Sequence, residues 1–402
     1  MVSELLPRDK VFFSEDGTLF DAACTLCGFG FPWEKLGVVE GQVRVGRIDG
    51  LLSDLKLIFL DFELGRFVKG DVDSWHEMCR KLRVFYDLDS RKGVLGELIG
   101  RNKSIFVEHR EEELVNKVDY FCNFGVKKEE VAKLILQCPE LLKLDLERPV
   151  FNVMKLLTHF SLSSVDLEDV SRRYGHVMGT NKMANLPNVM KALSLQEWFF
   201  KKIKDGNHML LADYIEGYPK EEQDLDYKEG LRIIRSLKTR VHNISKLNFL
   251  LGLGFGENTL TINLLNHLHG TSTELHERFD CLLRSKIEFS RLCMMVRTTP
   301  RILNQNSETI QRKVNFFHQE MGTTLNHVET FPAILYYHLE ERIIHRYRFH
   351  KWLSGKGLSC KKYSIRSMIA NNEKKFVARV FKIHPAAPKH WFEQFRHSNL
   401  SV

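Results

Sequence analysis

The sequence predicts an all-α fold, an α-solenoid in which helical units of about 30 residues stack into a superhelix. Three observations lead to this prediction. The last two copies of a proline motif lie 32 residues apart, and the three copies of a lysine–glycine motif are spaced by close to four and two such periods. After residue 70, almost no segment alternates between apolar and polar residues as a β-strand does. A helical unit this short buries its apolar face only by stacking on its neighbours, which is how a solenoid is organised.

The proline motif, Pro-x-x-Leu/Met, follows helical segments at four places. Proline ends a helix because it lacks an amide donor and clashes with the preceding turn, yet it is tolerated at the first position of the next helix. The last two of these prolines are separated by one period of the repeat. The four copies are Pro139-Glu-Leu-Leu142, Pro187-Asn-Val-Met190, Pro300-Arg-Ile-Leu303 and Pro332-Ala-Ile-Leu335.

The lysine–glycine motif consists of a lysine, a helix with one apolar face, and a glycine after the last turn. Glycine suits that place because the left-handed conformation that ends many helices is unstrained for it. The two spacings between the three lysines are close to four periods and two periods of the proline motif. The copies run from Lys117 to Gly125, from Lys246 to Gly254 and from Lys313 to Gly322. In addition, Thr271-Ser-Thr-Glu274 has the pattern of a capping box and predicts a helix that begins there and runs towards Met295.

Composition excludes two classes of protein. The chain has 402 residues, 43% of them hydrophobic, and its 28 Phe, 10 Tyr and 5 Trp against 10 Pro supply enough core material to exclude a disordered chain. No run approaches the roughly 20 apolar residues of a membrane-spanning helix, so we expect no membrane insertion. The length corresponds to two or three domains or to one elongated repeat array.

The eight cysteines are scattered, which indicates a reducing compartment rather than a disulfide scaffold. Cys24 and Cys27 form a lone C-x-x-C pair. A structural zinc site needs four ligands, and no second pair lies nearby. We therefore predict neither a metal site nor a cofactor and interpret the pair as core residues.

The first residues have the pattern of neither a signal peptide nor a transit peptide, because Glu4, Asp9 and Glu15 interrupt both. Either the protein stays where it is made or this chain lacks its true N-terminus. Residues 41–50 contain glycines and a short alternation, and they have no helical interpretation.

Residues 117–357 resemble the mitochondrial transcription termination factor (mTERF) family, especially its divergent plant members. The resemblance rests on the segments around Pro139, Pro300 and Pro332, on Gln311-Arg-Lys-Val-Asn-Phe-Phe317 and on the helix Leu339–Leu353. Residues 6–16 and 27–37 also look like the N-terminal repeats of plant members, whereas residues 41–66 depart from the pattern as an insertion or a gene-model fault would.

This resemblance implies a superhelix of units that each contain two α-helices and a short 3₁₀ turn, with a concave basic groove for double-stranded nucleic acid. It also implies an organellar role in transcription termination or initiation, intron splicing or ribosome assembly. Family members normally carry transit peptides, so the chain is expected to lack its N-terminal segment. We expect the mitochondrion as its location, with the plastid as the alternative.

We predict five regions. Atypical N-terminal repeats occupy residues 1–70, and a first mTERF-like repeat block occupies residues 71–215. An acidic loop follows at residues 216–230, where glycine, proline and several acidic residues interrupt the helical pattern. A second mTERF-like block spans residues 231–358, and a basic C-terminal tail spans residues 359–402.

Positive charge is concentrated at the C-terminal end of the chain. The chain as a whole carries +8, while residues 341–402 contain 14 Lys or Arg and 3 acidic residues. Residues 278–313 add eight basic residues against three acidic ones. Such asymmetry indicates a polyanionic partner, nucleic acid first and a membrane surface second, although a solvated basic end without a partner is the alternative interpretation.

The predicted interface binds phosphate through arginine, whose planar fork matches phosphate oxygens in pairs. The resemblance places Arg312 and Arg346 on second helices that face the groove. Arg342 and Arg346 fall on one side of a predicted helix, beside aromatic residues suited to stacking. The predicted phosphate-binding residues are Arg284, Arg297, Arg301, Arg312, Lys313, Arg342, Arg346, Arg348 and Lys351.

No pattern of residues indicates an enzyme. Gly252-Leu-Gly-Phe-Gly256 follows a helix and not a strand, so we interpret it as a helix end and not as a dinucleotide loop. No G-x-S-x-G nucleophile motif is present. Two function classes stay open. The first is an organellar regulator, acting as a monomer on double-stranded DNA or structured RNA; the second is a protein-binding helical scaffold.

Overall fold

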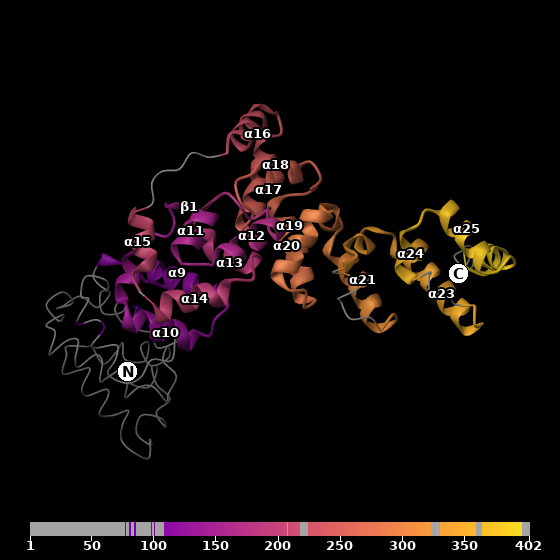
Figure 1. The fold of residues 1–402 in the computed structure, drawn as a ribbon, viewed down its shortest axis with the longest axis horizontal. Helices are drawn as coiled ribbons and strands as arrows, with labels where there is room; N and C mark the ends of the chain where they lie inside the picture. The colour runs from indigo at the N-terminus through magenta and orange to yellow at the C-terminus, as the bar shows by residue number, and fades with distance from the viewer. Residues whose placement is uncertain are drawn as a thin grey trace, which may run out of the picture.

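The computed structural model describes residues 108–206, 208–217, 224–322, 331–358 and 364–395, together with nine single residues (77, 80, 81, 84, 85, 98, 100, 328 and 330). Its helices follow one another along an elongated molecule, from α9–α15 at one end to α23–α25 at the other, with α16–α18 projecting to one side (Figure 1). The predicted N-terminal repeats, the Cys24–Cys27 pair and the unusual segment 41–66 lie outside the described residues.

The first part of the described chain runs through seven α-helices, two 3₁₀ helices and two short strands. The elements are α9 (Glu111–Cys122), α10 (Lys128–Gln137), η5 (Pro139–Lys143), β1 (Val150–Asn152), α11 (Val153–His159), α12 (Ser164–Arg173), β2 (Thr180–Lys182), η6 (Met183–Asn185), α13 (Leu186–Ala192), α14 (Gln196–Asp205) and α15 (Leu210–Gly217).

The second part continues with helical elements throughout its described residues. These are α16 (Leu225–Ser236), α17 (Arg240–Gly252), α18 (Thr259–Leu265), α19 (Ser272–Arg284), α20 (Phe289–Thr298), η7 (Pro300–Asn304), α21 (Ser307–Gln319), η8 (Pro332–Tyr336), η9 (Leu339–Ile344), α23 (His345–Gly355), α24 (Ile365–Ala370), α25 (Glu373–Ile383), α26 (Ala387–His390) and η10 (Trp391–Phe395). The elements η9 and η10 are single π-helical turns that lead into and out of α-helical segments.

The units α9–α10–η5 and α19–α20–η7 each consist of a helix, a turn, a second helix and a 3₁₀ turn, as the resemblance to the family implies. In the unit α9–α10–η5, Gly125 has φ +81° between the two helices, and Pro139 begins the 3₁₀ turn. Pro300 and Pro332 likewise begin η7 and η8. The fourth proline differs, because Pro187 lies in the first turn of α13. The fold is therefore the predicted all-α solenoid.

The capping box forms at the start of α19, where the Glu274 amide donates to Thr271 Oγ1 (3.3 Å) and the Thr271 amide donates to Glu274 Oε2 (2.7 Å). The helix ends at Arg284 and does not continue towards Met295. It stops there because Lys286 adopts φ +64°, a left-handed conformation that a helix cannot contain. A separate helix, α20, then begins after Glu288, which has an extended backbone.

A small antiparallel sheet interrupts the helices, although the sequence gives almost no strand signal there. β1 pairs with β2 in the register Val150↔Lys182 and Asn152↔Thr180. Thr180 also bridges to Glu257, which is distant along the chain. The pairing therefore fastens the α11–α12 region to the segment that follows α17.

The glycine-rich segment that ends α17 makes this junction. Gly254 has φ +91°, and the Gly256 amide donates to the carbonyl of His176 (2.9 Å). Side-chain amides add contacts across the junction: Asn188 Nδ2 donates to Gly252 O (2.8 Å), and Asn181 Nδ2 donates to Phe255 O (2.9 Å). The segment is thus a helix end, as predicted, and it also brings two parts of the solenoid into backbone contact.

Two of the predicted region boundaries differ from the observed elements. Helix α15 continues to Gly217 and α16 begins at Leu225, so the described ends of the predicted acidic loop are helical. The predicted basic tail contains α24, α25, α26 and η10, which form a second apolar core with α23 around Phe376 and Trp391. Residues 364–395 are therefore a folded unit and not a tail. None of the described helices is long and apolar enough to cross a membrane.

Burial of His176 next to the junction predicts a loss of stability in acid. Its side chain is fully buried against Phe255, and burial together with the nearby charge of Arg297 lowers its pKa to about 3. The unfolded chain takes up this proton near pH 6.5 while the folded chain does not, so stability falls as the pH drops below that value.

The contribution of His176 amounts to about 2 kcal/mol at pH 5. Denaturant unfolding measured from pH 7.5 to 5 should show this decrease in the free energy of unfolding. In His176→Leu the decrease should be smaller by that amount. The same replacement at the exposed His318 serves as the control and should leave the fall intact. An equal pH dependence in His176→Leu and the parent chain would contradict the assignment.

Candidate nucleic-acid interface

The nine predicted phosphate-binding residues fall into three structural groups. Some are enclosed by the protein and hydrogen-bonded to it, some line open hollows between units, and some lie on exposed helix faces. The first group requires a correction of the predicted site.

Lys313 is buried, with 1% of its surface exposed. Its Nζ donates to the carbonyl of Leu335 (2.7 Å) and to the side chain of Gln305. Burial lowers its pKa to about 8, against an opposing effect of Glu340. An ammonium enclosed in this way cannot reach a phosphate, so the prediction that Lys313 binds nucleic acid is corrected.

Arg346 is also buried, with 3% of its surface exposed. Its Nη1 donates to the carbonyl of Met368 (2.7 Å), its Nη2 donates to Glu373 Oε2 (2.8 Å), and its guanidinium lies over the ring of Phe376. It lies on the first helical segment of its unit, as does Arg312, so the expectation that both occupy second helices is wrong. Arg346 holds the end of α24 and is structural.

The neighbouring Arg342 is half-buried and has the same structural role. Its Nε donates to the carbonyl of Ile369 (2.8 Å), and its Nη2 donates to those of Ala370 (2.9 Å) and Asn371 (2.8 Å). Its guanidinium also stacks on Tyr337, 4.0 Å from the ring centre. These contacts satisfy carbonyls that the last turn of α24 leaves without partners, so its predicted role in binding phosphate is corrected too.

A cation at the same place recurs in other units. Arg278 Nη1 donates to the carbonyl of Leu303 (3.0 Å), Lys117 Nζ donates to that of Leu142, and Lys246 Nζ donates to those of Leu265 and Leu268 (both 3.1 Å). Leu142, Leu303 and Leu335 are each the fourth residue of a Pro-x-x-Leu motif. In the contacts Lys117–Leu142 and Lys313–Leu335, the two sequence motifs are therefore the two ends of one contact.

We call Lys117, Lys246, Arg278, Lys313 and Arg346 the staple cations. The last four follow one another at nearly equal intervals, close to the period of the proline motif. Burial lowers the pKa of all three staple lysines. The sequence signal for a staple cation was a basic residue that recurs on the first helix of successive units. Arg278 was missed because arginine takes the place of lysine at this position.

Two predicted residues line an open hollow between α18 and η7. Arg297 and Arg301 border this hollow of about 440 Å³ together with Asn263, His267 and Thr298. Arg297 Nη1 donates to the carbonyl of Arg173 at the end of α12 (2.8 Å), which fixes its orientation. The hollow combines cations with neutral hydrogen-bond donors, the side chains that bind phosphate oxygens.

A second hollow of about 870 Å³ lies beside α21 and is lined by Arg312, Asn306, Thr309, Tyr336 and other residues. The exposed Arg301 lies over the ring of Tyr336, 6.0 Å from its centre, so the two hollows are neighbours. Acidic side chains also line this hollow: Glu340 pairs with Arg312, and Glu373 pairs with Arg346. A polyanion would therefore have to displace Glu340 to contact Arg312.

The remaining three predicted residues are exposed on helix surfaces. Arg284 ends α19, and Arg348 and Lys351 lie on α23. At about 100° per residue, Arg348 and Lys351 point away from the buried side that Arg346 occupies. They are accessible but line neither hollow.

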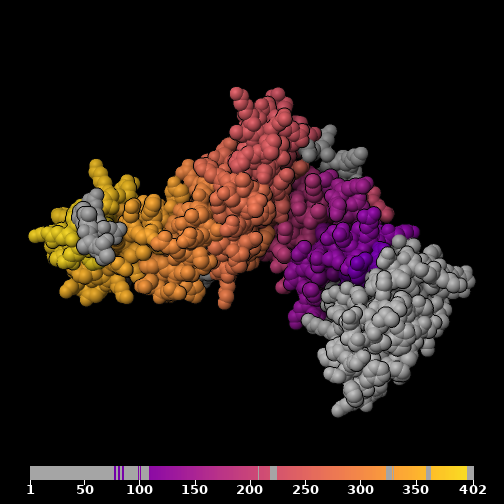
Figure 2. Space-filling view, turned by 180° about the vertical axis from the view of Figure 1, so that it is seen from behind, coloured from indigo at the N-terminus to yellow at the C-terminus, as the bar shows by residue number. Residues whose placement is uncertain are grey.

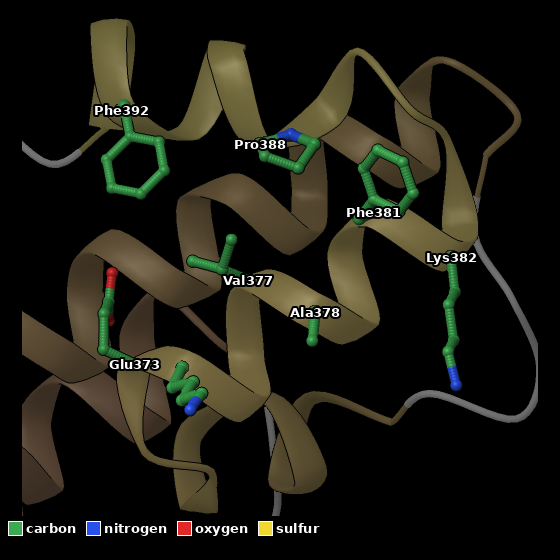
Figure 3. A pocket seen from close by; sticks show the side chains of 8 residues that line it. Glu373, Val377, Ala378, Phe381, Lys382, Pro388 and Phe392 are labelled. Carbon is green, nitrogen blue, oxygen red and sulfur yellow. The ribbon is translucent and has the colours of Figure 1, made fainter.

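A third hollow, of about 650 Å³, lies in the C-terminal unit and contains none of the nine residues (Figure 3). Val377 and Phe381 of α25 lie on the side of Pro388 and Phe392, and Ala378 and Lys382 also line the hollow. Its apolar lining does not suit phosphate. Within the described chain, no group of three or more His, Cys, Asp and Glu side chains is placed to hold a metal ion.

Comparison with known proteins identifies the family. The family model for mTERF matches residues 73–196 and 265–377. The chain is 44% identical to "Transcription termination factor MTEF18, mitochondrial" of Arabidopsis thaliana, over 98% of this chain and 78% of that protein. It is 22% identical to "Transcription termination factor MTERF8, chloroplastic" of the same plant, over 66% of this chain and 49% of that protein.

These matches support a regulatory role connected with nucleic acid rather than an enzymatic one. They agree with the geometry, in which a staple cation joins the first helix of a unit to the end of the same unit, and Arg301 and Arg312 are exposed beside the hollows between units. The chain belongs to the mTERF family.

Proposed function

We propose that the protein is a mitochondrial regulator of gene expression that binds double-stranded nucleic acid as a monomer. The observation that carries the proposal is the pair of neighbouring hollows along α18, η7 and α21, bordered by Arg297, Arg301 and Arg312. The name of the mitochondrial relative supports both the compartment and a role in transcription termination. Splicing of structured RNA is the alternative role within this proposal.

Each arginine has its own part in the proposed contact. Arg301 is exposed and carries the main phosphate contact, while Arg297 is held by the Arg173 carbonyl and orients a neighbouring phosphate. Arg312 exchanges Glu340 for phosphate, because a guanidinium binds both groups through the same fork. Arg284, Arg348 and Lys351 add longer-range attraction from the exposed helix faces.

Neutralising two of these side chains should weaken binding and its dependence on salt. For Arg301→Gln/Arg312→Gln, loss of two phosphate contacts should lower the slope of log affinity against log salt by about 1.8, with similar loss on unrelated sequences. Fluorescence anisotropy with duplex DNA and duplex RNA measures both quantities between about 50 and 200 mM salt.

Arg148→Gln/Arg172→Gln is the matched control, because both arginines are highly exposed and each pairs with an acid three residues away. This variant has the same charge and should keep the parent slope. Equal slopes for both double variants would show that general charge, and not this face, attracts nucleic acid. If crosslinking of the full chain in mitochondria recovers proteins only, the scaffold hypothesis replaces this one.

A further inference from the structure

The corner between α16 and α17 exposes aliphatic side chains that the fold does not use. Ile233, Leu237 and Val241 follow one another at intervals of four residues, and they are 49%, 44% and 76% exposed. Helix α16 buries only Tyr227 and Ile234. Three exposed aliphatic side chains within nine residues of the connection between two helices indicate an interaction surface rather than scattered surface residues.

The same corner is basic. Arg232, Arg235, Lys238 and Arg240 are exposed around the aliphatic side chains, and Arg232 pairs with Glu229 on its own helix. From Gly230 to Gly256 the sequence contains no Asp or Glu. An aliphatic surface surrounded by cations complements a partner that is both apolar and anionic.

The corner also projects from the molecule. Helix α16 lies at the outer end of a projection from the long axis (Figure 1), and the space-filling view from behind shows the same segment standing out from the body (Figure 2). Residues 225–264 lie between the two segments that match the family model. The projection is therefore not part of what the matched repeats share.

We propose that this corner binds the surface of an anionic membrane. Ile233, Leu237 and Val241 enter the headgroup region, while Arg235, Lys238 and Arg240 bind lipid phosphates. The protein lies on the membrane through this contact and does not cross it.

Shape and chemistry favour this partner over two others. A fluid lipid surface adapts to a projecting corner, whereas a peptide helix needs a groove, and the hollow beside Val241 measures only about 390 Å³. A nucleic acid would satisfy the cations but leave the three aliphatic side chains in water. The bilayer accommodates both kinds of side chain.

Sedimentation of the full chain with vesicles tests the proposal. One set contains phosphatidylcholine alone, and the other contains roughly one third phosphatidylglycerol, which supplies the negative surface potential. The chain should sediment with the anionic vesicles only. Leu237→Ser/Val241→Ser should weaken this partitioning at least about tenfold, because each side chain loses apolar burial. Arg235→Gln/Lys238→Gln should weaken it by a similar factor.

Matched controls separate this surface from general effects. Val165→Ser changes an aliphatic residue of α12 that is 75% exposed, and Arg148→Gln/Arg172→Gln removes two charges elsewhere; both should leave sedimentation unchanged. Absence of sedimentation with anionic vesicles would overturn the proposal. The proposal would also fail if the parent chain bound a synthetic helical peptide with acidic flanks through Val241 and did not bind vesicles.

The proposal is independent of nucleic-acid binding. The corner variants should keep the duplex affinity and salt slope of the parent chain. If they lose duplex binding in the same proportion as vesicle binding, the corner is a nucleic-acid site and the membrane proposal fails.

Discussion

Gly256→Ala is expected to destabilise the protein by about 3–5 kcal/mol, because an added methyl group has no space at the junction. A Cβ there would lie 2.1 Å from the carbonyl oxygen of Met178 and 2.7 Å from that of Val177. Both neighbours are backbone atoms, so no side-chain rotation can relieve the clash. The backbone must separate, and the hydrogen bonds from Gly256 to His176 and from Glu257 to Thr180 are lost with it.

Gly252→Ala is the matched control in the same segment. A Cβ at Gly252 meets no atom within 4 Å, and the residue is helical, so alanine should be neutral or slightly stabilising. Denaturant unfolding gives the free-energy difference, and limited proteolysis shows whether cleavage begins near residues 174–190 and 252–258. Equal stability of the two variants would contradict the role given to this junction.

Arg346→Met is expected to cost about 3 kcal/mol, because it removes the charge partner of Glu373 and leaves the buried carbonyl of Met368 without its donor. Since Arg346 joins α23 to α24 and α25, the loss should concentrate in the C-terminal unit. Hydrogen exchange should rise in residues 364–395 before it rises elsewhere.

Arg348→Met provides the comparison, since it removes the same charge from an exposed position of the same helix. Its effect on stability should stay within about 0.5 kcal/mol. Arg346→Lys should not restore stability, because one ammonium cannot make the forked contacts of a guanidinium. If Arg348→Met destabilised the chain as much as Arg346→Met, the staple assignment would be wrong.

The local chemistry of the units could be predicted from the sequence. Pro139, Pro300 and Pro332 each begin a 3₁₀ turn. Proline has no amide hydrogen to donate to the preceding turn, so an α-helix does not continue through it. The capping box at Thr271 formed for a similar reason, since both partners lie within one turn. These features depend on neighbours in sequence.

Which basic residues are buried and which are exposed could not be predicted from the sequence in the same way. The excess of basic residues in 278–313 predicted Lys313 as part of the interface, and the family resemblance placed Arg346 there. Their actual partners, Leu335 and Met368, lie in the following helical segments, and such contacts depend on how the second helix of the unit returns. A count of charged residues along the sequence does not distinguish a cation that carbonyl groups bury from one that solvent surrounds.

The sequence by itself determined the all-α solenoid, its repeat period and its concentration of positive charge, because helix signals, turn residues and charge are local properties. Only the tertiary structure decided which cations join the two ends of a unit and which, such as Arg301, border open hollows. It also showed that the segment of Gly254 and Gly256, which the sequence predicts to be a helix end, makes backbone contact with a distant part of the chain. The reason is that burial and backbone contact are created by stacking, which brings together residues that are distant along the chain.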